Sequence, residues 1–399
     1  MSTRKTEVTR VGVRKRRRWL RVLLWVLVVL GLVFYAGGGW YFADQLQADA
    51  FQVRPFEREY RATISSIDGD MVSIAQGDPA DAALFDPGVM GLVWDGGHAT
   101  VSDIVEKTDI EVTRMITSME GDPVVVGTPV DVDSWFYPDD FATALGVETE
   151  EIIYPTTLGD MDAVFIPGTS NTWAVLVHGK DATPRETMRL GGLMAEAGYP
   201  VLAISHRNDQ GQPADPSGFH QYGVSEWEDL EAAVRYAENQ GAEKVVLGGL
   251  STGGALILSF LENSDEAARV SGVVLDSPNI NFGATVTHVA ARRKIPLIGL
   301  PVPSSLAWVA KTIGSWRLGV DWQKIDYVSR ADQLDIPIPI LILHGTEDQS
   351  VPIETSRDLA AARPDLVTLV EFEGAEHVGS WNVDQARYVE KLQLFLKGL

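Results

Sequence analysis

A serine held between two glycines is the pattern in this chain that most directly suggests chemistry. Gly249-x-Ser251-x-Gly253 follows an apolar run of strand length and precedes a small-residue start to an apolar helix. Glycines suit these places because a side chain two residues before or after the serine would collide with the backbone of a very tight turn. Such a turn exposes a hydroxyl at the carboxyl end of a strand. Ser251 is therefore the predicted nucleophile of an acyl-transfer reaction.

A serine hydroxyl becomes a good nucleophile only when an imidazole takes its proton and a carboxylate fixes the tautomer of that imidazole. Two later apolar runs end in such groups, the first in His344-Gly345-Thr346-Glu347-Asp348 and the second in Gly374-Ala375-Glu376-His377. We predict that Asp348 is the acid and His377 the base. The alternatives are His206 and His220 for the base, and Asp276 for the acid.

The negative charge that develops on an attacked carbonyl oxygen needs fixed hydrogen-bond donors. The expected donors are the backbone N–H of Thr252, directly after the serine, and that of Lys180, in the loop after His178-Gly179. This chemistry implies no metal and no organic cofactor. A metal cluster built from His206 and Asp209 would lack a third partner at ligand spacing, so we predict no metal site.

These groups need a scaffold that brings them to one edge of a sheet. From about residue 151, apolar strands alternate with helical patterns, which predicts an α/β domain with a mostly parallel sheet over 151–399. All three candidates follow predicted strands, where open α/β sheets place their sites. Residues 279–330 form a long, Trp-rich insertion, predicted to be a cap with an apolar wall over Ser251. The alternative is a helical pair packed on the body.

The motifs Gly-Leu-Ser-Thr-Gly-Gly-Ala, His-Gly-Thr-Glu-Asp-Gln-Ser-Val-Pro and Gly-Ala-Glu-His-Val-Gly-Ser-Trp-Asn resemble the α/β-hydrolase superfamily. More narrowly, they are similar to its membrane-anchored, serine-peptidase-like and esterase-like branch. The resemblance covers residues 151–399 and implies that nucleophile, acid and histidine follow the fifth, seventh and eighth strands. The leading hypothesis is a serine hydrolase that cleaves an ester, thioester or amide of a small-molecule or lipid-like acyl substrate. The alternative is a non-catalytic binding or scaffold protein with a degenerate hydrolase body.

The amino terminus carries a membrane signal. Residues 1–21 hold nine Lys or Arg and one acid, and residues 22–43 contain no charge. A run of that length suffices for a transmembrane helix, and the basic segment before it predicts a cytoplasmic amino terminus and an extracytoplasmic body. The expected location is therefore the cell membrane, with a single pass. The alternative is a cleaved signal peptide.

A linker over 44–59 and a small β-rich accessory region over 60–150 are expected to precede the hydrolase body. The runs that predict strands in this region are Tyr60–Ile67, Met71–Ala75, Gly91–Trp94 and Val124–Val130.

Charge and cysteine content exclude several classes of protein. The net charge is −22, and because residues 1–21 contribute +8, the remaining 378 residues carry −30. A body this acidic is repelled by phosphate backbones, which argues against nucleic-acid binding. The chain has no cysteine, which excludes disulfides, thiolate metal sites and a cysteine nucleophile.

Overall fold

The computed structural model describes residues 8–81, 83–296, 299–333 and 337–399. Residues 1–7 of the predicted basic segment therefore lie outside the described part of the chain. The protein divides into two compact units. One consists of residues up to 50 together with 290–321, and the other of residues 51–289 together with 322–399.

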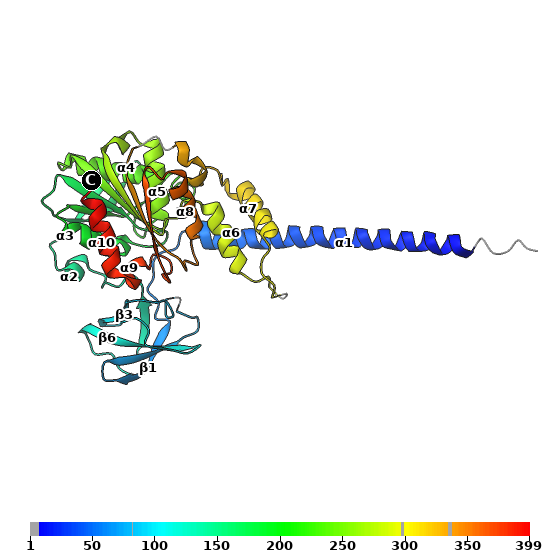
Figure 1. Ribbon diagram of the computed structural model, residues 1–399, viewed down its shortest axis with the longest axis horizontal. Coiled ribbons are helices and arrows are strands. Elements are labelled where there is room, and N and C mark those ends of the chain that lie inside the picture. The colour runs from blue at the N-terminus through cyan, green and yellow to red at the C-terminus, as the bar shows by residue number, and fades with distance from the viewer. Residues whose placement is uncertain (1–7, 82, 297–298, 334–336) are drawn as a thin grey trace, which may run out of the picture. The chain divides into compact units, whose positions relative to one another are not determined.

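An eight-stranded sheet forms the centre of the second unit (Figure 1). Its strands are β8 (Glu150–Pro155), β9 (Asp160–Ile166), β10 (Thr172–Val177), β11 (Val201–Ile204), β12 (Lys244–Leu250), β13 (Val270–Asp276), β14 (Ile340–Gly345) and β15 (Val367–Phe372). Their order across the sheet is β15-β14-β13-β12-β10-β11-β9-β8. The six strands from β10 onward pair in parallel, whereas β8 and β9 are antiparallel additions at one edge. The predicted mostly parallel sheet is confirmed.

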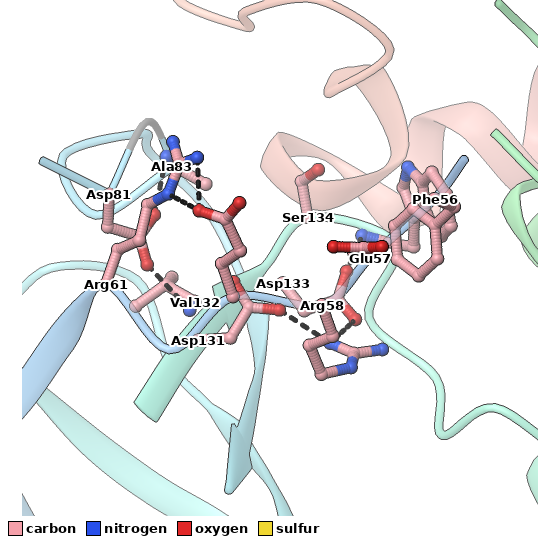
Figure 2. A pocket seen from close by; sticks show the side chains of 12 residues that line it. Phe56, Glu57, Arg58, Arg61, Asp81, Ala83, Asp131, Val132, Asp133 and Ser134 are labelled. Carbon is pink, nitrogen blue, oxygen red and sulfur yellow. Dashed lines mark hydrogen bonds and ion pairs between the residues drawn. The ribbon is translucent and has the colours of Figure 1, made fainter. Parts of the chain in front are cut away.

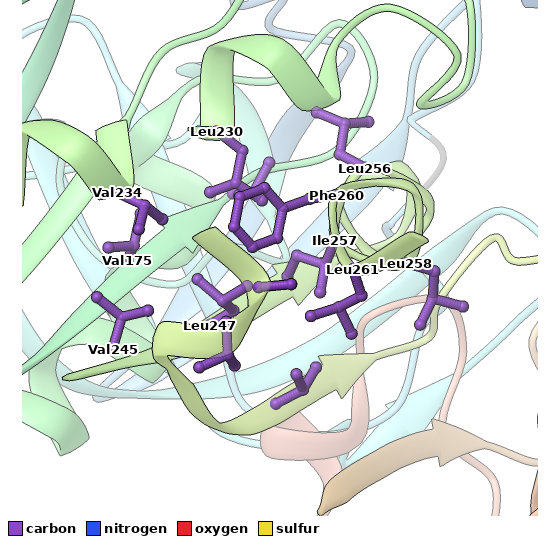
Figure 3. Packing of buried hydrophobic residues seen from close by; sticks show 14 of the residues in the cluster. Val175, Leu230, Val234, Val245, Leu247, Leu256, Ile257, Leu258, Phe260 and Leu261 are labelled. Atoms are coloured by element: carbon purple, nitrogen blue, oxygen red, sulfur yellow. The ribbon is translucent and has the colours of Figure 1, made fainter. Parts of the chain in front are cut away.

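Helices cover both faces of this sheet, because alternate strand residues point to opposite sides. On β12, Val245 and Leu247 belong to one buried cluster and Val246 to another. Figure 3 shows the first cluster, in which Leu230 and Phe260 pack over Leu247. The near-continuous apolar runs of the sequence therefore mark strands that are buried on both faces.

The helices that connect the strands supply the other half of each cluster. They are η2 (Pro184–Thr187), α3 (Met188–Glu196), α4 (Trp227–Asn239), α5 (Thr252–Asn263), η3 (Asp265–Arg269), α6 (Phe282–Arg292), η4 (Val328–Gln333), α8 (Ile353–Ala362), α9 (Ser380–Val383) and α10 (Gln385–Leu396). The cluster around Leu247 includes residues of α4 and α5, and the opposite cluster includes residues of α3 and α10. A layered arrangement with a sheet between helices follows from this division.

The β-rich region of the second unit is a closed sheet. Its strands are β1 (Ala62–Asp68), β2 (Met71–Gln76), β3 (Met90–Trp94), β4 (Gly97–Val101), β5 (Glu106–Lys107), β6 (Glu111–Gly121) and β7 (Pro129–Asp133), followed by α2 (Phe141–Leu145). The order is β2-β1-β7-β3-β4-β6-β5, and pairing between β2 and β6 closes the ring. Three predicted strands coincide with β1, β2 and β3. The run 124–130 reaches β7 only at its end, and β4, β5 and β6 were not predicted.

The first unit contains α1 (Val8–Leu46), the start of η1 (Gln47–Phe51) and α7 (Ser304–Leu318). The stretch Arg18–Phe51 is long and apolar enough to cross a membrane. Part of the predicted 279–330 insertion, residues 290–321, therefore packs with the amino-terminal helix. That the insertion forms a cap over Ser251 stays a prediction.

Candidate active site

Ser251 occupies the turn between β12 and α5, and its backbone is strained. Its φ of 50° and ψ of −116° lie in a region that residues with side chains rarely adopt. The turn is possible only because its flanks lack side chains. A Cβ on Gly253 would lie 2.3 Å from the carbonyl oxygen of Val177, and one on Gly249 would lie 2.8 Å from the backbone of Gly253. The steric reason given for the two glycines is therefore confirmed.

The structure brings the three predicted side chains into one hydrogen-bonded row. His377 Nε2 lies 2.9 Å from Ser251 Oγ, and His377 Nδ1 lies 2.7 Å from Asp348 Oδ2. Ser251 follows the fifth strand of the sheet, Asp348 lies after the seventh and His377 after the eighth. The carboxyl ends of adjacent parallel strands lie at one edge, so residues 126 positions apart meet there.

Asp348 is held rigidly by its surroundings. Its Oδ1 accepts hydrogen bonds of 2.8 Å from the backbone N–H groups of Ser350 and Val351, while His344 Nε2 lies 3.2 Å from its Oδ2. Burial alone would raise the pKa of Asp348. The charge of His377 and the hydrogen bonds from His344 and His377 outweigh burial and hold that pKa well below its ordinary value. The carboxylate is therefore ionised wherever the protein is folded near neutral pH.

His377 is held by Asp348 and is partly accessible to solvent. Burial would lower its pKa, but the negative charge of Asp348 and its hydrogen bond outweigh burial and raise the pKa above the ordinary value. Its side chain is 26% exposed, in contrast to that of Asp348, which is fully covered. The imidazole therefore faces outward, and the carboxylate lies behind it.

The alternative acid and bases take other positions. Asp276 is buried, and its carboxylate accepts a hydrogen bond of 3.1 Å from Tyr388 Oη. His220 Nε2 lies 2.8 Å from Asp181. The ring of His206 stacks on that of His178, with 4.4 Å between centroids. In the described part of the chain, Ser251 Oγ has His377 as its histidine partner.

The positions of the two predicted oxyanion donors fit that role. Thr252 is the first residue of α5, where a backbone N–H has no partner within the helix. Gly179 lies against Ser251, since a Cβ placed on it would be 3.2 Å from Ser251 Cβ. The N–H of Gly179 donates to Glu186 Oε2 at 2.6 Å and is therefore already used, and the N–H of Lys180 follows it directly. Among the described residues, neither Thr252 N nor Lys180 N has a hydrogen-bond acceptor.

A buried His–Asp pair holds the same loop from behind, and the sequence did not indicate it. His178 Nδ1 lies 2.8 Å from the carbonyl oxygen of Gly179, and its Nε2 lies 2.8 Å from Asp209 Oδ2. Both partners are acceptors, so this geometry favours the doubly protonated, positively charged form of His178, in which both ring nitrogens donate. Burial would lower the pKa of His178, but the charge of Asp209 outweighs burial and raises it. The carbonyl of Gly179 and the N–H of Lys180 belong to one peptide plane, so this pair orients a predicted oxyanion donor.

Among the described residues, this cluster is the one group of three side chains that could together hold a metal ion. His178, His206 and Asp209 offer ligand atoms within 4.8 Å of one another, so the expectation that His206 and Asp209 lack a third partner was wrong. However, both nitrogens of His178 are used as donors, and the two rings are stacked with 20° between their planes. Stacked rings direct their lone pairs along nearly parallel lines and not at one point. The cluster fits an ion pair better than a metal site.

A cavity of about 280 Å³ lies away from this site, between the linker and the closed sheet (Figure 2). Its lining includes Phe56, Arg58 and the end of β7 but not Ser251. Arg58 makes ion pairs with Asp131 at 2.6 Å and Asp133 at 3.1 Å. Burial and the charge of Asp133 raise the pKa of Asp131 to about 6. Two acids of this cavity are thus paired with an arginine of the chain, and the cavity is separate from the Ser251 site.

Comparison with known proteins agrees with the fold of the hydrolase body. The sequence profile of the Alpha/beta hydrolase family matches residues 163–391, more than half of the chain. The chain belongs to this family. The esterase Pf2001 of Pyrococcus furiosus is similar in structure, with a TM-score of 0.50 and 18% identity over 65% of this chain and 96% of the esterase. At that identity the likeness concerns the fold.

Two curated bacterial proteins are similar in sequence, and both are described as uncharacterised. YfhR of Escherichia coli K12 is 22% identical over 272 residues, which cover 63% of this chain and 82% of YfhR. YqkD of Bacillus subtilis is 23% identical over 235 residues, which cover 58% of this chain and 72% of YqkD.

Proposed function

We propose that this protein is a serine hydrolase that cleaves an ester, thioester or amide through an acyl-enzyme on Ser251. The observation that carries the proposal is the position of His377, with Nε2 2.9 Å from Ser251 Oγ and Nδ1 2.7 Å from Asp348. An imidazole held in this way can take the serine proton, and its tautomer is set by the carboxylate. Membership of the α/β-hydrolase family and the fold shared with an esterase support the same reaction class.

The reaction follows from these positions. Ser251 Oγ attacks the substrate carbonyl carbon while its proton moves to His377 Nε2, and the carbonyl oxygen takes the negative charge. The N–H groups of Thr252 and Lys180 stabilise that charge. When the carbonyl re-forms, the bond to the leaving group breaks and the leaving group takes the proton from Nε2. Water then attacks the acyl-enzyme in the same way, which releases the acid and restores Ser251.

Covalent labelling tests this proposal directly. A fluorophosphonate probe should label the purified full-length protein at Ser251, with Ser251→Ala as the matched control. Labelling of the natural chain alone is the expected result. Equal labelling of both proteins, or of neither, would contradict the hydrolase proposal. Labelling of neither protein, with both folded, would favour the alternative of a binding or scaffold protein with a degenerate hydrolase body.

We further propose that α1 anchors the protein in a membrane, with the amino terminus in the cytoplasm and the hydrolase body outside it. The apolar stretch Arg18–Phe51 supports the anchor. The excess of Lys and Arg in residues 1–21 supports the orientation. An acyl substrate of the small-molecule or lipid-like kind suits an enzyme held at such a surface.

A further inference from the structure

Helix α7 packs closely on α1, the candidate membrane-crossing helix, within one compact unit (Figure 1). Two glycines of α1 permit the approach, since a Cβ on Gly39 would lie 2.4 Å from a methyl group of Val309. A Cβ on Gly38 would lie 3.2 Å from Leu306. Small residues of this kind allow helices in membranes to approach each other through their backbones.

Polar and aromatic contacts extend this interface along the outer end of α1. Tyr35 Oη lies 2.8 Å from Ser305 Oγ, and the rings of Trp40 and Trp316 have centroids 6.3 Å apart. Arg317 pairs with Asp44 at 2.5 Å. A second ion pair, of 2.8 Å, joins Arg293 and Asp49. The segment 290–321 is therefore fixed to the end of α1 and the start of η1, between Tyr35 and Asp49.

These contacts set the depth of α7 relative to a bilayer. The charge-free run of α1 ends at Ala43, and Asp44 is the first acid after it. Tyr35 precedes Asp44 by nine residues, which is about 13 Å along a helix that rises 1.5 Å per residue. A bilayer that covers the charge-free run, with a hydrocarbon core of about 30 Å, would therefore reach the amino-terminal part of α7.

The side chains that α7 exposes are of the kind found at membrane interfaces. Trp308 is 65% and Trp316 76% exposed, and Leu300 in the preceding turn is 60% exposed. All eleven tryptophans lie in the described residues, and the five that are exposed are three on α1 and two on α7. Tryptophan is enriched at the boundary between headgroups and acyl chains, where its ring is amphipathic.

The charge of this segment is opposite to that of the chain. Residues 290–321 hold five Lys or Arg and one Asp, a net charge of +4, although the whole chain carries −22. Arg292 and Lys294 are exposed. Basic groups beside exposed aromatic side chains are typical of helices that bind the surface of an anionic membrane.

We propose that the segment 290–321 is a second membrane contact, lying in the outer interface beside α1. Trp308, Trp316 and Leu300 enter the boundary between acyl chains and headgroups. The exposed Arg292 and Lys294 meet lipid phosphates, whereas Arg293 and Arg317 hold the segment to the acids that follow the charge-free run. The proposal rests on the proposed anchoring of α1 and is independent of the proposed hydrolysis. It makes the segment a lipid-binding element of a protein whose other residues after position 21 are acidic overall.

The absence of cysteine permits a direct measurement of depth. A nitroxide label is attached in turn to Trp308→Cys and Trp316→Cys, with the full-length protein in vesicles of phosphatidylcholine and phosphatidylglycerol. Trp25→Cys, on the exposed surface of α1, is the membrane control, and Glu354→Cys, on α8, is the aqueous control. Relaxation by oxygen reports contact with lipid, and relaxation by a water-soluble nickel chelate reports contact with water. Matching thermal unfolding of all four proteins shows that they are folded.

The proposal expects both α7 labels to favour oxygen over nickel, as the label at position 25 does. If position 25 is in lipid but both α7 positions behave like position 354, the second contact is wrong and the anchor stands. If position 25 is also in water, anchor and second contact fall together, and fluorophosphonate labelling of Ser251 is unaffected. Spin–spin broadening at α7 that disappears on dilution with unlabelled protein would mean that a second copy covers this face, which also overturns the proposal.

Discussion

Strained residues gather around Ser251, and each is held in place by its neighbours. Ser251, Ser277 and Val378 have φ values of 50°, 47° and 53°. Val378, which follows His377, is β-branched and donates its N–H to Ser277 Oγ at 3.0 Å. Positive φ is costly for such a residue and persists only where surrounding contacts enforce it. The histidine loop is thus fixed to the turn after β13, which limits the movement of the imidazole.

The two buried acids near His377 are expected to differ sharply on substitution. Asp348→Asn should reduce kcat by about 10⁴, because the amide no longer sets the histidine tautomer. Asp276→Asn should have a much smaller effect. Burial raises the pKa of Asp276, and its partner is Tyr388 and not the imidazole nitrogen. Hydrolysis of a small chromogenic ester by both folded variants measures this difference. An inactive Asp276→Asn beside an active Asp348→Asn would show that the acid is wrongly assigned.

The pH profile of kcat/KM should report the raised pKa of His377. Only the neutral imidazole can take the serine proton, so activity is lost as pH falls through the pKa of the folded enzyme. Asp348 raises that pKa, so the acid limb should have its midpoint above about 6.5, the ordinary value for histidine. In Asp348→Asn, the residual activity should show a midpoint at lower pH. A midpoint that is the same in both proteins would argue against control by this pair.

Asp209 is expected to act as a positioning residue through His178. Asp209→Asn removes the charge that keeps His178 doubly protonated, so the peptide that carries Lys180 N–H is held less firmly. Loss of a whole oxyanion donor costs about 10² to 10³ in kcat, and loosening one should cost roughly 10-fold to 10²-fold. KM should change little, because the donor acts mainly on the transition state. Asp365→Asn, an exposed acid, is the control. Equal changes in KM and kcat would indicate a general structural role.

At the scale of elements, the segment that follows α1 is built into the hydrolase unit. Phe51 is buried, and its ring lies 5.6 Å from those of Tyr222 and Phe282. Its carbonyl accepts from His220 N at 2.9 Å, and Arg54 N donates to Asp181 at 3.1 Å. Asp181 adjoins Lys180, so a segment expected to be a plain linker contacts the predicted oxyanion loop.

Phe51→Ala should therefore destabilise the protein by about 3–5 kcal/mol, the usual cost of truncating a buried phenylalanine. Urea unfolding of the detergent-solubilised protein measures this cost. Tyr60→Ala, at a position 42% exposed, should stay within about 0.5 kcal/mol of the natural chain. Equal stability of both variants would show that residues 51–54 do not contribute to the folded body.

At the scale of the whole molecule, the asymmetry of charge predicts the topology. Nine Lys or Arg precede the apolar run, and Asp44 and Asp49 follow it. Basic segments are retained in the cytoplasm, so the carboxyl terminus should be exported. A reporter that works only outside the cytoplasm, fused after Leu399, should be active, and a cytoplasm-only reporter at the same place inactive. The reverse pair of results would contradict both the orientation and the proposed location.

Much of the sheet could be predicted from the sequence because its signals are local. Apolar runs mark buried strands, and the glycines beside Ser251 reflect a steric requirement within a few residues of chain. The strand order places the predicted Ser251, Asp348 and His377 at one edge, and their catalytic roles stay a prediction. What the sequence determined was therefore the parallel strands of the body and the candidates at their ends, whereas the antiparallel β8 and β9 were not predicted.

Contacts between distant parts of the chain were decided only by the tertiary structure. Strand β6 escaped prediction because Arg114 interrupts its apolar alternation. In the fold, Arg114 is fully buried and donates to carbonyl oxygens, among them those of Gly88 and Ser102. His178 meets Asp209 from 31 residues away, and Ser305 meets Tyr35 from 270 residues away. Periodicity and spacing describe neighbours along the chain, whereas these pairings depend on which surfaces the folded chain brings together.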